Sequence, residues 1–119
     1  MVLADTSIWI DHLRKGEQGL AALLEDNQVL VHPFVVGELA CGNLRNRQSI
    51  LAMLQDLPAV TVATDAEVLA FIEAQSLMAR GIGYIDAHLL ASVALSPPAR
   101  LWTRDKALLG VAQDLGQIM

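Results

Sequence analysis

Four acidic residues stand at expected strand ends or within helices that should be buried: Asp5, Glu38, Asp86 and Asp105. Each has an ordinary structural explanation, because an aspartate can cap a helix and a glutamate can lie on a solvated helix face. Glu38 and Asp86, however, lie within the apolar segments PFVVGELACG and GIGYIDAHLLASVAL, where helices should be buried on most sides. Because an unpaired buried carboxylate is costly, such segments require a cation or a hydrogen-bond donor nearby.

The four carboxylates together indicate a chemistry that none of them indicates alone. Clustered carboxylates raise one another's pKa, so a structure that gathers them needs a divalent metal. Ligation by oxygen alone suits Mg²⁺ or Mn²⁺. A metal held in this way activates water and stabilises the leaving oxygen of a phosphodiester. The residue types therefore predict a hydrolytic nuclease in which Asp5, Glu38, Asp86 and Asp105 are both catalytic residues and metal ligands.

Length and cysteine content limit the architecture. A chain of 119 residues fits one domain, and we expect residues 1–119 to form it. The lone Cys41 excludes an internal disulfide and a cysteine-based zinc site, and it is compatible with a reducing compartment. Because the sequence has no signal peptide and no apolar run of membrane-spanning length, we expect a cytoplasmic protein with no membrane association.

The charge balance and the hydropathy bear on possible partners. Eight basic side chains against 13 acidic ones give a formal charge of −5, which argues against a broad electrostatic grip on nucleic acid. This objection weakens if the acids bind divalent cations, because the ions can then bridge to phosphate. With 54% apolar residues and a mean hydropathy of +0.43, the chain has more apolar surface than a small core needs. We therefore expect an obligate partner, a homodimer or both.

Apolar runs that suit short strands alternate with helical patterns along the chain. The expected strands lie at residues 2–4, 29–31, 59–63 and 101–103. The expected helices lie at residues 6–14, 18–26, 33–42, 46–56, 65–80, 84–95 and 105–115. Alternation of this kind predicts a doubly wound α/β fold with a parallel sheet, whose functional crevice lies at the carboxyl ends of the strands. Asp5 and Asp105 each follow a strand and should reach that crevice.

Four segments, in this order, carry a resemblance to a known family: LADTSIWIDHLR, HPFVVGELACG, GIGYIDAHLLASVAL and LWTRDKALL. The sequence resembles the PIN-domain ribonucleases of the VapC toxin family, from bacterial toxin–antitoxin pairs, over nearly its whole length. The resemblance implies a three-layer α/β/α sandwich and an acidic pocket that binds Mg²⁺ or Mn²⁺ and cleaves RNA. It also implies a homodimer and a cognate antitoxin that obstructs the pocket.

Position by position, the resemblance implies roles for particular residues. Asp5 and Asp86 match direct metal ligands, whereas Glu38 and Asp105 match acids that ligate a second ion, act through water or orient the nucleophile. Ser7 matches a small hydroxyl residue that supports the site, although it could instead cap the first helix.

Other polar and aromatic residues remain open between a functional and a structural role. Five cations could contact RNA phosphate or lie on a solvated surface: Arg45, Arg47, Arg80, Arg104 and Lys106. We expect His88 to be a hydrogen-bonded histidine and not a ligand. We expect Trp9 and Trp102 to belong to the core or to an interface, because each lies in an apolar run.

Two alternatives remain beside the ribonuclease. One is an RNA-binding inhibitor of translation that does not cut, and the other is an aspartyl-phosphate phosphotransfer protein. The second is disfavoured because Ser7 stands where a phosphatase of that kind would place a second aspartate. The sequence leaves the RNA open between transfer and ribosomal RNA. It also makes the final strand doubtful, because the tail DLGQIM is barely long enough to form one.

Overall fold

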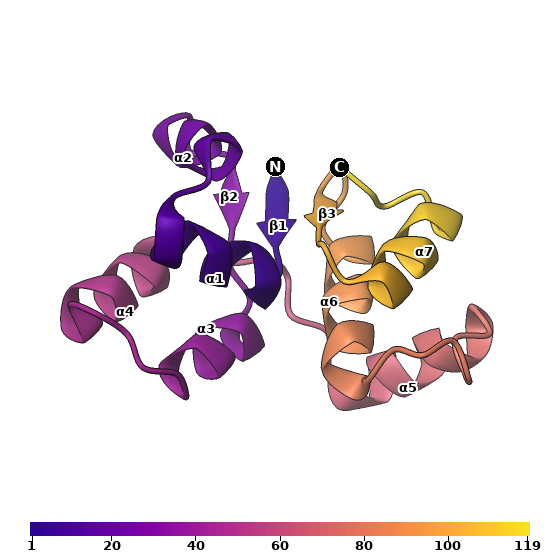
Figure 1. Ribbon diagram of the computed structural model, residues 1–119. Coiled ribbons are helices and arrows are strands. Elements are labelled where there is room, and N and C mark those ends of the chain that lie inside the picture. The colour runs from indigo at the N-terminus through magenta and orange to yellow at the C-terminus, as the bar shows by residue number, and fades with distance from the viewer.

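A small parallel sheet organises the computed structural model, which describes residues 1–119. Its strands run in the spatial order β2-β1-β3, and both neighbours pair with β1 in parallel. Figure 1 shows β1 in the middle with helices on either side of the sheet, which confirms the predicted α/β class. The strands are β1 (Val2–Ala4), β2 (Val29–Leu30) and β3 (Arg100–Trp102).

Seven helices connect and cover the strands. Most of them follow the apolar periodicity of the sequence closely. Their bounds are α1 (Thr6–Lys15), α2 (Gln18–Glu25), α3 (Pro33–Ala40), α4 (Arg47–Asp56), α5 (Asp65–Ala74), α6 (Tyr84–Ala94) and α7 (Lys106–Asp114). None of these helices is long and apolar enough to cross a membrane.

The core forms around the central strand. Every residue of β1 is buried, and Leu3 pairs with Leu30 on one side and with Leu101 on the other. Trp9, on the inner face of α1, is fully buried in the same cluster, so the expectation of a core tryptophan is confirmed. An apolar run buried on both faces is typical of a strand at the centre of a parallel sheet.

Residues 59–63, predicted as a strand, do not form one. The segment makes a single parallel bridge, between Ala59 and Val31, at the edge of the sheet. Beyond the bridge, the N–H groups of Thr61 and Ala63 donate to the hydroxyls of Ser96 and Ser92, at 2.9 and 3.1 Å. The prediction was wrong because two serine hydroxyls satisfy this β-prone backbone in place of a partner strand.

Helix α5 was predicted to extend to residue 80, but it ends at Ala74. Ser76 adopts a left-handed conformation with φ of 53°, and the N–H of Leu77 donates to the carbonyl of Ile72 at 3.0 Å. This pattern is the Schellman ending of a helix, which usually has glycine at the left-handed position. Burial of Leu77 against the core accompanies the turn, and the absence of glycine hid it from sequence reasoning.

Both chain ends lie at the amino ends of the strands. Val2 pairs with Arg100 at the start of the sheet. The tail contributes only a single parallel bridge, between Ile118 and Leu101. Figure 1 shows the N and C labels close together at this end, opposite the ends toward which the strands point.

The serine contacts of residues 59–63 can be tested by substitution. Ser92→Ala leaves the N–H of the buried Ala63 without an acceptor, so we expect the free energy of unfolding to fall by about 1–3 kcal/mol. Ser96→Ala is the matched control, because Thr61 is exposed and water can replace the hydroxyl. Urea unfolding followed by circular dichroism measures both variants. Equal losses would contradict the role given to the buried bond.

Candidate functional site

Asp5 lies where three elements meet. It follows β1, caps the N-terminus of α1, and its backbone N–H donates to the carbonyl of Trp102 at 3.0 Å. Its carboxylate is only 6% exposed. One carboxylate oxygen accepts from the N–H of Ile8 at 3.3 Å, so the predicted helix cap is present.

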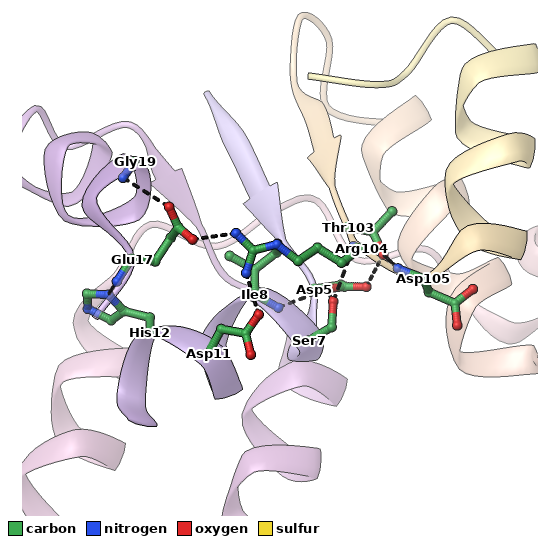
Figure 2. Close-up of polar contacts among 10 residues, drawn as sticks. All are labelled: Asp5, Ser7, Ile8, Asp11, His12, Glu17, Gly19, Thr103, Arg104 and Asp105. Atoms are coloured by element: carbon green, nitrogen blue, oxygen red, sulfur yellow. Dashed lines mark hydrogen bonds and ion pairs between the residues drawn. The ribbon is translucent and has the colours of Figure 1, made fainter. Parts of the chain in front are cut away.

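Two hydroxyl groups hold the same carboxylate (Figure 2). Ser7 donates to one oxygen of Asp5 and Thr103 donates to the other. Ser7 also accepts from the backbone N–H of Arg104 at 3.3 Å, and Thr103 accepts from that of Asp105 at 3.1 Å. The hydroxyls therefore join the start of α1 to the segment that leaves β3. Sequence reasoning named Ser7 but missed Thr103, whose only signal was a threonine at a strand end two residues before an acid.

Asp105 is the N-cap of α7 and accepts from the N–H of Leu108 at 2.9 Å. Its side chain is exposed. The prediction that Asp105 caps a helix is therefore confirmed. The cap uses one carboxylate oxygen, and the other accepts no hydrogen bond within the protein.

Asp86 is partly buried in the first turn of α6, where it accepts from the N–H of Gly83 at 3.4 Å. Burial raises the pKa of its carboxyl group, and the backbone hydrogen bond opposes this change. The negative charges of Asp105, Asp5 and Glu38 raise the pKa further, in that order. The other three predicted acids therefore lie close enough to Asp86 for their charges to act on it.

Glu38 lies on an exposed part of α3, which corrects the expectation that this helix is buried nearly all round. Val35 and Leu39 face the core, while Phe34 and Gly37 are exposed along with Glu38. The carboxylate accepts from the hydroxyl of Thr6 at 2.7 Å, which holds it toward the start of α1.

The oxygens of the four carboxylates suit a hard cation such as Mg²⁺, but the side chains do not surround a common metal position. No lysine or arginine contacts any of the four carboxylates, and their hydrogen-bond partners are hydroxyls and backbone N–H groups. No group of three or more His, Cys, Asp or Glu side chains has the arrangement needed to hold a metal ion. The four carboxylates repel one another, and their side chains would have to rotate to coordinate a common ion.

Arg104, one of the cations considered for RNA phosphate, is already engaged. Its guanidinium forms ion pairs with Asp11 of α1 and with Glu17, the N-cap of α2 (Figure 2). It also lies 6.0 Å from the ring centre of Trp102. These contacts hold the segment after β3 against α1, so the guanidinium acts within the protein.

Two buried histidines, His32 and His88, lie at the start of α3 and on α6. His88 is buried, and its Nε2 is 3.0 Å from a carboxylate oxygen of Asp65, in agreement with the expected hydrogen-bonded histidine. His32 caps α3 through Nδ1, which accepts from the N–H of Phe34 at 2.9 Å. Burial lowers the pKa of His32 to about 4, and the nearby His88 adds to the shift. His32 therefore has a structural position at the start of α3, which carries Glu38, and His88 has one within α6, which carries Asp86.

Comparison with known proteins identifies the family of the chain. The model of the PIN domain family matches residues 2–113. Ribonuclease VapC32 from two strains of Mycobacterium tuberculosis is 45% identical to the chain over 116 residues, which cover 98% of this chain and 94% of each relative. On the strength of matches that span nearly its whole length, the chain belongs to the PIN-domain family and is a relative of the VapC ribonucleases.

Proposed function

We propose that the protein is the toxin of a toxin–antitoxin pair and that it hydrolyses RNA phosphodiester bonds with the help of Mg²⁺ or Mn²⁺. The observation that carries this proposal is that burial and the charges of three other carboxylates, Asp105, Asp5 and Glu38, raise the pKa of Asp86, while no cationic side chain compensates them. The similarity to a protein named as a ribonuclease supports the choice of RNA. Without a metal, the repulsion among these carboxylates would lower the stability of the fold.

The four acids and Thr103 have different proposed roles at this site. Asp5 and Asp86 are the proposed direct ligands, and Glu38 and Asp105 are proposed to hold a second ion or to orient the attacking water. When bound, the metal would lower the pKa of that water and neutralise charge on the phosphate. Thr103 fixes the orientation of Asp5 through its hydroxyl, since a buried ligand with a fixed partner keeps its geometry.

The proposed partners follow from the same family relationship and from the surface. We propose a cognate antitoxin, a homodimer and an intracellular location. Several large apolar side chains are more than a third exposed, including Leu69, Met78, Tyr84 and Leu95. A protein partner could bury these side chains.

Metal-dependent cleavage is the direct test of the function. Purified protein incubated with total cellular RNA and Mg²⁺ or Mn²⁺ should cut it, and EDTA should prevent cutting. Asp5→Asn should reduce the rate more than the roughly 10–100-fold that loss of an outer partner of a metal ligand costs. Asparagine is also a good N-cap, so the variant should keep α1 intact in circular dichroism. Growth arrest by a wild type that leaves all RNA intact would refute the nuclease and favour the RNA-binding inhibitor.

Asp86→Asn separates function from stability. The folded state holds this carboxyl at a raised pKa, so its ionised form is penalised at neutral pH. We therefore expect Asp86→Asn to raise the melting temperature at pH 7 while abolishing cleavage. The gain should shrink as the pH falls through the raised pKa, because the wild-type carboxyl then takes up its proton.

The effect of added metal on the melting temperature is a second test of Asp86→Asn. Mg²⁺ or Mn²⁺ should raise the melting temperature of the wild type, because a ligand of the folded state stabilises it, and the effect should be lost in Asp86→Asn. A lower melting temperature for Asp86→Asn without metal would instead show that the carboxylate is structural.

Thr103→Val tests the positioning of Asp5 with nearly unchanged side-chain shape. It removes the hydroxyl that donates to the carboxylate, so we expect cleavage to fall by about 10–100-fold and the metal concentration for half-maximal rate to rise. Thr103→Ser restores the hydroxyl and should recover both quantities. A loss of stability with unchanged metal dependence would assign Thr103 a purely structural role.

A further inference from the structure

The arginines of this acidic protein differ in whether they have partners. Four of them are engaged: Arg47 donates to the carbonyls of Ala40 and Gly42, Arg80 pairs with Asp114, Arg100 donates to the carbonyl of Ala99, and Arg104 pairs with Asp11 and Glu17. Arg14 and Arg45 form no hydrogen bond or ion pair within the chain, and both are exposed. Their charge is therefore available to a ligand.

These two arginines line the same pocket. The pocket has a volume of about 540 Å³ and lies among α1, α3, the loop of residues 41–46 and α4. Its size is within the range of roughly 300–1,000 Å³ that is usual for small-ligand sites. Beside the two arginines, the lining includes Leu13, Leu39, Ile50, Asn43 and Asn46.

The lining combines apolar side chains, amides, guanidinium groups and the carboxylate of Glu38. Apolar side chains such as Leu13, Leu39 and Ile50 are the more buried part, while Asn43 and Asn46 are exposed. The asparagine amides can donate and accept hydrogen bonds, as the edge of a nucleobase requires. Apolar surface, amides and guanidinium groups together suit a ligand with a flat ring and a phosphate.

The pocket adjoins the candidate metal site and its wall is braced. Glu38 lines the pocket and also belongs to the group of carboxylates around Asp86. Arg47 donates to backbone carbonyls at the end of α3, which ties α4 to the start of the loop. Asn46 adopts a left-handed conformation with φ of 53°, which asparagine tolerates better than most residues. The loop therefore has a defined shape beside the acids.

We propose that this pocket binds an unstacked nucleotide of the substrate RNA next to the bond that is cut. Arg14 and Arg45 pair with backbone phosphates, and the amides of Asn43 and Asn46 contact the base. The proposal rests on the proposed ribonuclease function and identifies the surface that holds its substrate. It also explains how a protein with a net charge of −5 could hold RNA, because two guanidinium groups without partners line the pocket that is proposed to bind it. Lys15 and Lys106 do not line the pocket.

The test measures how RNA binding depends on salt. A short fluorescein-labelled single-stranded RNA of mixed sequence is titrated with the Asp86→Asn protein, which should bind without cutting, at several salt concentrations. Each phosphate contact contributes about 0.7 to the slope of log affinity against log salt for single strands. We therefore expect Arg14→Gln and Arg45→Gln each to lower the slope by about 0.7 and to weaken binding. Arg14→Lys and Arg45→Lys should keep most of the slope.

Arg100→Gln is the matched control, because it makes the same charge change at an exposed residue at the start of β3, away from the pocket. It should leave the slope unchanged. If Arg14→Gln and Arg45→Gln behave like this control, RNA does not occupy the pocket and the proposal is overturned. Loss of affinity for the antitoxin instead of RNA would overturn it too and assign the pocket to a protein partner.

Cleavage by the wild type, measured in parallel, separates this proposal from the one on which it rests. If the wild type cuts RNA while the pocket variants bind normally, only the nucleotide site is wrong. If the wild type binds with the expected slope and does not cut, the ribonuclease function is wrong and the nucleotide site stands.

Discussion

The hydrogen bonds to the buried carboxylate of Asp5 hold the elements of this site together. Its oxygens accept hydrogen bonds from the start of α1 and from Thr103 after β3, and its backbone N–H reaches the carbonyl of Trp102. Since leaving a buried charge without donors is expensive, these bonds cannot be given up independently. Helix capping and metal binding are therefore compatible roles, because the hydrogen bonds that cap α1 also fix the orientation of the proposed ligand.

Charge is distributed so that the acids remain uncompensated. Arg104 is next to Asp105 in the sequence, but its guanidinium pairs with Asp11 and Glu17. It therefore supports the site without neutralising the four acids. Burial and the charges of Asp105, Asp5 and Glu38 all raise the pKa of Asp86. Perturbed pKa values of this kind are common at functional sites.

The fold class could be predicted because it depends on local pattern. The four acids were selected by the same kind of pattern, and their role as a metal site stays a prediction. Apolar runs followed by an acid mark strand ends, and helical spacing marks most of the helices. The end of α5 could not be predicted, because Ser76 takes the left-handed position that glycine usually signals. The same holds for Thr103, whose partner Asp5 lies 98 residues away in sequence. Contacts of that separation exist only once the sheet has formed.

The position of the chain ends has a practical consequence. Both ends meet at the amino edge of the sheet, where Val2 pairs beside Arg100 and Ile118 bridges to Leu101, while the acids gather at the opposite edge. A fluorescent protein or an affinity tag fused at either end would stand away from the carboxylates. The ends could also be joined by a short linker and the chain reopened in an exposed loop, since circular permutation is best tolerated where the termini are close.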